Sequence, residues 1–220
     1  METGDQPLMT GLRTRHKPPV FKSPKVCRRC GNRRPANFMM SLKQAEKYGD
    51  IFFLTIKSVN GLPVILNERY YKIILDSLKF CRENKGLKIY AYTILLNHMH
   101  LVVMVGKGLS LSDMIGDFKK FTANRIFKQL KLDKQFDLLN EFRMNVRNDK
   151  NSDCRIWRRD CFPKVVETEK FFLQKVNYID LNAAKHNVVK DIEEYPYTSY
   201  HNHYCNHKVA LEVDDIKELL

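Results

Sequence analysis

Two histidines separated by one residue, His98 and His100, stand within the apolar run of residues 91–105. A run this rich in Ile, Leu and Val predicts a central β-strand, and the two-residue period of a strand directs both imidazoles to one face of a sheet. Two imidazoles on one face can bind a metal ion together. They can equally be core histidines hydrogen-bonded to the backbone or to each other, so the pair alone leaves both interpretations open.

A second polar group lies on a helix predicted over residues 170–184, where apolar residues recur with the helical period. Tyr178 and Asn182 are four residues apart and are therefore neighbours on this helix, with Lys175 and Lys185 nearby on the same side. A phenol, a carboxamide and two ammonium groups project together. An ordinary amphipathic helix with a tyrosine at its boundary explains the same spacing.

The two groups resemble the HUH single-tyrosine transposases of the IS200-like family, most closely their REP-associated tyrosine transposase branch. His98-Met99-His100 matches the His-hydrophobic-His motif, and residues 178–182 match the Tyr-Ile-x-x-Asn motif. Weaker agreements in order and spacing are found at residues 51–56, 118–123 and 156–157, and the resemblance covers about residues 45–204. Where family members commonly continue with Pro-Val-Arg-Ala, residues 183–186 read Ala-Ala-Lys-His, and we expect the helix to run on.

The resemblance implies a metal-dependent enzyme in which Tyr178 is the nucleophile. A tyrosine hydroxyl has a pKa of about 10 and attacks poorly at neutral pH, so the phosphate must be polarised. A divalent cation bound by neutral nitrogens of His98 and His100 and by the amide oxygen of Asn182 would do this. Such ligands suit Mg²⁺ or Mn²⁺, of which Mn²⁺ accepts imidazole more readily.

The implied reaction is in-line attack by Tyr178 on single-stranded, hairpin-forming DNA, giving a 5′-phosphotyrosine link and a free 3′-hydroxyl. The link preserves the ester energy, so a transposase or nickase-ligase of this kind needs no nucleotide cofactor. Two alternatives stay open. One is a non-catalytic, domesticated protein that binds structured DNA or RNA, and the other is a metal-dependent hydrolase that uses water as its nucleophile.

Composition agrees with a nucleic-acid partner. The 220 residues are 44% hydrophobic, enough for one well-cored domain, and carry a net charge of +13. Nucleic acid is the default partner for such a charge, with a membrane surface as the competitor. Because no apolar stretch reaches about 18 residues and no signal pattern opens the chain, we expect no membrane insertion and a cytoplasmic protein. The family resemblance implies association with nucleoid DNA and leaves both a monomer and a homodimer open.

The residues predicted to contact DNA are basic or aromatic. They are Lys119, Lys120, Arg125, Lys128, Arg155, Trp157, Arg158, Lys175 and Lys185. The indole of Trp157 between guanidinium groups has the composition of a platform that stacks an unpaired base, although core packing explains it equally. For the lysines and arginines, solvated helix charges are the alternative.

We divide the chain into a basic, proline-rich arm (residues 1–44), the transposase-like domain (45–204) and a tail (205–220). Cys27 and Cys30 form a Cys-x-x-Cys-Gly turn typical of a zinc knuckle. A structural zinc needs four ligands, and Cys205 and His207 are candidates to complete it, with free thiols as the alternative.

The remaining pattern predicts an α+β fold. Strands are expected at 51–56, 88–95 and 98–105, and helices at 67–84 and 110–130, the first starting at Asn67 and the second at Ser110. Thr168 is the expected cap of the Tyr178 helix. Residues 131–153 are polar and weakly periodic. This order fits a ferredoxin-like antiparallel sheet with helices packed on one face.

Overall fold

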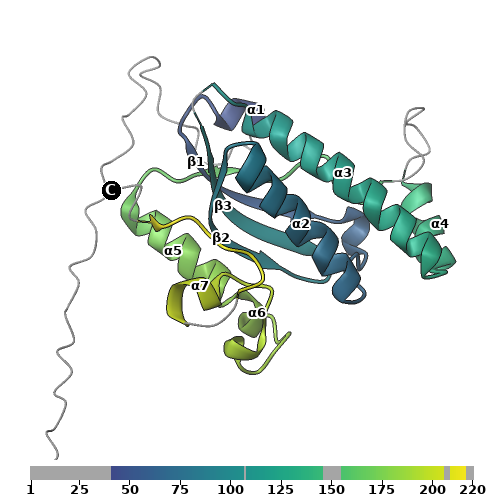
Figure 1. Ribbon diagram of the computed structural model, residues 1–220. Helices are drawn as coiled ribbons and strands as arrows, with labels where there is room; N and C mark the ends of the chain where they lie inside the picture. The colour runs from purple at the N-terminus through teal and green to yellow at the C-terminus, as the bar shows by residue number, and fades with distance from the viewer. Residues whose placement is uncertain (1–40, 107, 146–154, 206–208, 217–220) are drawn as a thin grey trace, which may run out of the picture.

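The computed structural model describes residues 41–106, 108–145, 155–205 and 209–216. Its centre is a four-stranded antiparallel sheet in the order β2-β3-β1-β4 (Figure 1). The strands are β1 (Ile51–Lys57), β2 (Leu87–Ile94), β3 (His98–Val105) and β4 (Lys164–Val165). Helix α2 (Glu68–Asn84) joins β1 to β2, and α3 (Leu111–Leu132) follows β3. This β-α-β-β-α-β order is the ferredoxin-like arrangement, and it confirms the predicted α+β class.

Shorter elements complete the described chain. They are α1 (Leu42–Ala45), η1 (Val59–Gly61), α4 (Phe136–Met144), α5 (Glu169–Asp180), α6 (Asn182–Lys185), η2 (Ile192–Glu194) and α7 (Tyr200–Tyr204). The three long helices begin at the expected caps, because the side chains of Asn67, Ser110 and Thr168 each accept a hydrogen bond from a backbone N–H in the first turn.

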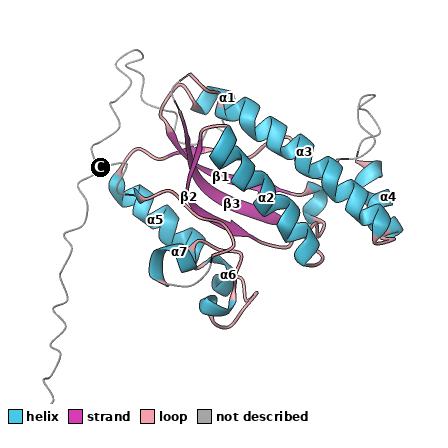
Figure 2. Ribbon diagram, in the orientation of Figure 1, coloured by secondary structure: helices cyan, strands magenta, loops and turns pink. Residues whose placement is uncertain are grey.

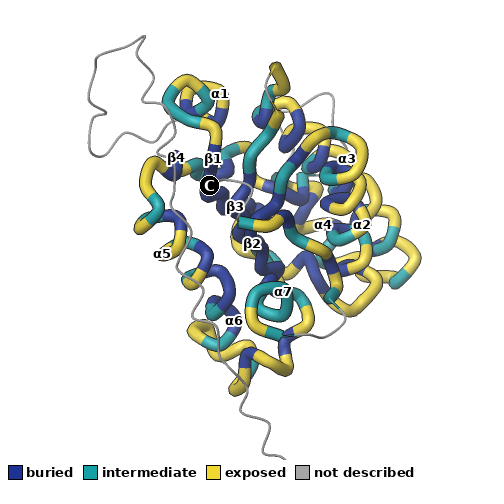
Figure 3. Tube along the Cα trace, turned by 60° about the vertical axis from the view of Figure 1, so that its left-hand side comes forward, coloured by how far each residue is buried: buried dark blue, intermediate teal, exposed yellow. Residues whose placement is uncertain are grey.

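The central strand β1 is buried on both faces (Figures 2 and 3). Its side chains point alternately to the two faces, and each face packs against different helices. Phe52, Leu54 and Ile56 belong to the core formed with α2 and α3, whereas Ile51 and Phe53 pack in a second core with α5. Successive strand residues point to opposite faces. Helices α2 and α3 therefore share one face, as expected, and α5 covers the other, which is also the face of His98 and His100.

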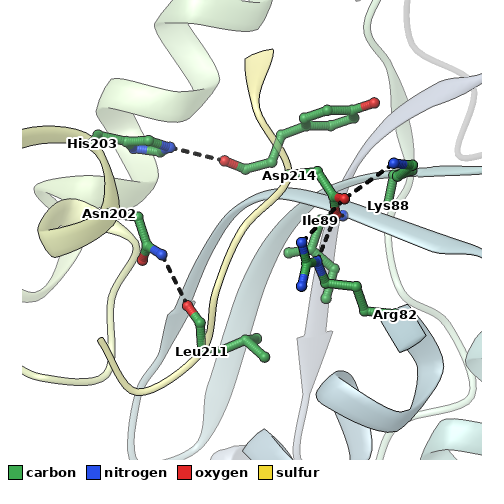
Figure 4. A network of polar contacts seen from close by, with 8 residues as sticks. Arg82, Lys88, Ile89, Asn202, His203, Leu211 and Asp214 are labelled. Atoms are coloured by element: carbon green, nitrogen blue, oxygen red, sulfur yellow. Dashed lines mark hydrogen bonds and ion pairs between the residues drawn. The ribbon is translucent and has the colours of Figure 1, made fainter. Parts of the chain in front are cut away.

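The C-terminal segment 209–216 packs along β2 (Figure 4). Asp214 donates its backbone N–H to the carbonyl of Ile89 at 2.7 Å, and its carboxylate accepts the Ile89 N–H at 2.8 Å. Arg82 and Lys88 complete the ring of donors at 2.9 and 3.3 Å. Burial acts to raise the pKa of Asp214, but these hydrogen bonds outweigh it and hold the pKa below its usual range. This part of the predicted tail is thus integral to the domain.

The other differences from the predicted organisation are local. Leu42 and Ala45 are buried in the main core, so the domain begins before residue 45. Residues 136–144, which lie in the polar and weakly periodic stretch 131–153, form α4, which buries Leu139 and Phe142 against the core. Within the described residues, no helix is long and apolar enough to cross a membrane.

Candidate active site

His98 and His100 lie together on the α5 face of β3. Their ring centroids are 5.0 Å apart at a steep angle, and Phe53 of β1 stacks on His100 at 5.4 Å. The register places Thr55 opposite His100 and Lys57 opposite His98. The strand period therefore produces the shared face that the sequence predicted.

Neighbouring side chains orient the two rings. The amide of Asn97 donates its Nδ2–H to the carbonyl of Gly61 at 2.9 Å, which turns its Oδ1 toward His98 Nδ1 at 2.7 Å. An amide oxygen only accepts, so Nδ1 of His98 carries the proton and Nε2 keeps its lone pair. His100 Nδ1 lies 2.9 Å from the Thr55 hydroxyl, a contact that fixes this ring through the same nitrogen. In metal-binding histidines, a hydrogen bond to the ring nitrogen that does not bind the metal typically fixes the orientation of the ring.

Both imidazoles are held neutral. Burial, followed by Lys57 and His186, lowers the pKa of His98 to about 4. Burial and then His98, with weaker effects of nearby cations, lowers the pKa of His100 to about 3. Neutral imidazole is the form that can bind a metal ion.

Tyr178, on α5, packs against this pair. Its ring centroid lies 5.4 Å from that of His100 and 6.0 Å from that of Phe53, edge-on in both cases. The ammonium groups of Lys175 and Lys185 lie 5.4 and 5.6 Å from the Tyr178 ring centroid. Burial, followed by repulsion from Lys164, lowers the pKa of Lys175. The structure thus brings together the phenol, both lysines and the histidines predicted from separate segments.

The helix carrying Tyr178 does not run on, contrary to our expectation from the missing proline. It ends at Asp180, and α6 begins at Asn182 after a break at Leu181. Asp180 is fully buried, and its carboxylate accepts a 2.6 Å hydrogen bond from Ser199 and lies 2.7 Å from His203 Nδ1. These contacts with residues some twenty positions later hold the chain at the point where α5 ends. Tyr178 and Asn182 are therefore not neighbours on one continuous helix.

Asn182 is fully buried, and neither its Oδ1 nor its Nδ2 has a hydrogen-bond partner among the described residues. Buried amides are normally satisfied, so an orphaned one requires an explanation. No group of three or more His, Cys, Asp or Glu side chains in the described ranges is arranged to hold a metal ion. A site built on the two histidines therefore needs a ligand of another type, and an amide oxygen is one.

Sequence reasoning missed several residues around the histidines. The ring of His186 lies 6.1 Å from that of His98, which places α6 beside the start of β3. Its spacing of four from Asn182 was a usable signal. Thr55 and Lys57 carried no such signal, because the pairing of β1 with β3 alone brings them to the site. Asn97 directly precedes His98, but its hydrogen bond to the ring could not be read from that position.

Two residues predicted to contact DNA serve the core instead. Trp157 is 5% exposed, and its indole N–H donates to Thr122 at 2.9 Å, so the ring is not a base-stacking platform. Lys119 donates to the backbone carbonyls of residues 158, 159 and 160 at 3.0 to 3.1 Å. Its ammonium is occupied in holding this loop against α3, and burial lowers its pKa.

The other predicted contacts divide between the two faces. Lys120 and Arg125 line a groove between α2 and α3, on the sheet face opposite Tyr178, and Lys128 is exposed on α3. Arg155 is half-buried, and Arg158 is exposed beside His98. For the predicted zinc site, Cys27, Cys30 and His207 lie outside the described residues. Cys205 is a half-buried free thiol.

Comparison with known proteins confirms the family resemblance. The family model described as Transposase IS200 like matches residues 62–142, which include β2, β3 with both histidines, and α3. The chain is therefore similar to the IS200-like transposases over this part of its length.

Individual relatives point to one branch. A Haemophilus influenzae protein assigned as a REP-associated tyrosine transposase is 23% identical over 154 residues, which span 70% of this chain and 81% of that protein. A solved REP-associated tyrosine transposase bound to a REP hairpin superposes with a TM-score of 0.52 at 17% identity, covering 84% of this chain and 93% of the other. The second likeness confirms the fold.

Proposed function

We propose that this protein is a tyrosine transposase that cleaves and rejoins single-stranded DNA beside a hairpin. The observation that carries the proposal is the packing of Tyr178 of α5 edge-on against His100, 5.4 Å away, with two lysines around the phenol. A protein that only binds nucleic acid has no physical need for this combination. The similarity to the IS200-like transposases supports the same function.

The residues present fit a divalent cation, Mg²⁺ or Mn²⁺, held by His98, His100 and Asn182. The histidines are neutral with pKa values of about 4 and 3, and the buried amide of Asn182 lacks any partner among the described residues. When bound, the cation would polarise a phosphate oxygen. Asn97 and Thr55 would keep the two rings oriented for it.

In the proposed reaction, the phenol oxygen of Tyr178 forms a bond to phosphorus while the bond from phosphorus to the 3′ oxygen breaks. The phenol proton passes to water, and the leaving 3′ oxygen takes a proton from water. Lys175 and Lys185 supply positive charge beside the phenol that favours the attacked phosphate. Since the 5′-phosphotyrosine is still an ester, attack by another 3′-hydroxyl reverses the chemistry and rejoins DNA.

Hairpin DNA is the substrate we propose. The structural relative is bound to a REP hairpin, and the net charge of +13 favours a polyanion. A hairpin with unpaired flanks presents both a duplex for shape recognition and a single strand that can enter the face shared by β3 and α5.

The test is the formation of a covalent adduct. Purified protein, a pool of DNA hairpins with randomised unpaired flanks and Mn²⁺ should give a protein–DNA band on a denaturing gel. Tyr178→Phe should abolish the band, whereas Tyr204→Phe, at an exposed tyrosine of α7, should retain it. Hairpin binding without an adduct would indicate a binding protein, and cleavage by Tyr178→Phe would indicate water as the nucleophile.

A further inference from the structure

A cleft of about 470 Å³ opens beside His98, and Tyr178 does not line it. The register of β1 and β3 shows where it lies. Tyr178 packs over Phe53 and His100, whereas the cleft begins at Lys57, which pairs with His98, and continues past the end of β1. The phenol and the cleft therefore flank the histidine pair from opposite sides along the strands. The volume falls within the range of small-molecule sites.

The lining of the cleft is basic and polar. Its nine residues include Lys57 and Arg158 but no carboxylate, although Arg158 pairs at the rim with Asp160 at 3.0 Å. Asn60 and Asn145 add two amides, joined by a 3.1 Å hydrogen bond from one to the other. Cations and amides without acids suit a nucleotide, which has a phosphate and a hydrogen-bonding base edge.

An aromatic ring, that of Phe162, lies next to the cleft against these two cations, although it is not among the nine residues that line the cleft. The ring centroid of Phe162 lies 6.0 Å from Lys57 Nζ and 5.1 Å from Arg158 Cζ. Phe162 has a φ of +43°, a left-handed conformation that is unfavourable for a residue with a bulky side chain. Such strain is typically maintained at ligand sites, and here it accompanies a half-buried ring beside a basic cleft.

We propose that this cleft binds the nucleotide whose 3′ oxygen leaves when Tyr178 attacks, an inference that rests on the proposed function. Attacking and leaving oxygens lie roughly in line through phosphorus. With the phenol on the Phe53 side of the histidines, the leaving nucleotide extends to the other side, where the cleft lies. Phe162 stacks its base, Lys57 and Arg158 contact its phosphate, and Asn60 reads the base edge.

The experiment uses the same randomised hairpin pool and the full chain. The cleaved DNA is sequenced, and base preferences are scored at the nucleotides immediately before and after the broken phosphodiester. Wild-type protein should select a base at the preceding position. Phe162→Leu should flatten that preference and slow adduct formation about tenfold, in line with the loss of base stacking, without changing the preference after the break. Lys57→Met should slow the reaction similarly.

Lys79→Met is the matched control, because it removes the same charge from the exposed side of α2. It should retain the wild-type rate and preference, and thermal unfolding should confirm that each variant is folded. Unchanged preference in Phe162→Leu, or equal loss on both sides of the break, would overturn the cleft assignment while leaving the tyrosine chemistry standing. Absence of any adduct with the wild type would overturn both, since the leaving side is then undefined.

Discussion

Replacing Asn182 by leucine should stabilise the metal-free protein. The side chain is 0% exposed, and both of its polar atoms lack a partner among the described residues. Each buried, unsatisfied polar group costs roughly 1–3 kcal/mol. Leucine branches at the same carbon as asparagine but is larger. Overpacking therefore offsets part of this gain, at a cost of about 1–3 kcal/mol. We therefore expect a net gain of about 1–2 kcal/mol in the free energy of unfolding.

Thermal unfolding in the presence of a chelator measures this gain. For a domain of this size, 1 kcal/mol corresponds to about 2–4 °C in Tm, so the variant should melt roughly 2–8 °C higher. Added Mn²⁺ should reverse the order. At a hundredfold excess over Kd the wild type gains about 2.7 kcal/mol, whereas the variant, without the proposed third ligand, should gain little.

The control is Asn177→Leu, the same change at an exposed position of α5. It should alter stability by no more than about 0.5 kcal/mol and leave the Mn²⁺ response intact. A loss of more than about 1 kcal/mol in the stability of metal-free Asn182→Leu would refute the prediction, because the amide must then be satisfied in the native state. A full Mn²⁺ response in that variant would remove Asn182 from the ligand set.

Three further predictions concern stability. Metal-free protein should lose stability as pH falls below about 6.5, since the unfolded state binds protons before His98 and His100, whose folded pKa values are about 4 and 3. The loss should be at most about 2 kcal/mol per histidine at pH 5, with no contribution above pH 7, and urea denaturation of H98Q/H100Q should show a shallower decline. Asp214→Ala should lower the free energy of unfolding by about 2–4 kcal/mol in the same assay, because the half-buried guanidinium of Arg82 loses its carboxylate acceptor. Lys119→Met should cost about 1–3 kcal/mol by freeing three carbonyls, yet leave the salt dependence of hairpin binding, measured by fluorescence anisotropy, unchanged.

The local pattern of apolar residues was sufficient to predict the strands and helices whose sequences are periodic. The strands at β1, β2 and β3 and the helices α2, α3 and α5 follow apolar repeats and side-chain caps, so the sequence located them to within a few residues. The same period placed both histidines on one face. The orientation of their rings was not predictable, because Asn97 acts through a hydrogen bond to Gly61 that exists only after the β2-β3 hairpin meets the end of β1.

The errors arose where distant contacts override composition. An indole between guanidinium groups is typical of a base-stacking platform, but the indole N–H of Trp157 donates to the hydroxyl of Thr122, which lies thirty-five residues earlier on α3. The helical pattern around Lys119 predicts a solvent-exposed cation, whereas the loop at residues 158–160 supplies its ammonium with three carbonyl acceptors. Neither contact leaves a trace in local spacing.

The motif around Tyr178 includes Asp180, whose buried carboxylate is held by side chains from the C-terminal part of the chain. His203 Nε2 lies 3.1 Å from the carbonyl of Tyr90, which can only accept, so that nitrogen carries a proton and the ring is fixed with Nδ1 toward Asp180. Ser199 holds the other carboxylate oxygen and also bonds to the backbone of Tyr92 in β2. The end of α5 is thereby attached to the sheet through α7. Tyr178 precedes this buried carboxylate by two residues, and Asn182 follows it by two. The residues that hold Asp180 belong to the C-terminal part of the chain, which therefore helps to anchor the end of the helix on which Tyr178 lies.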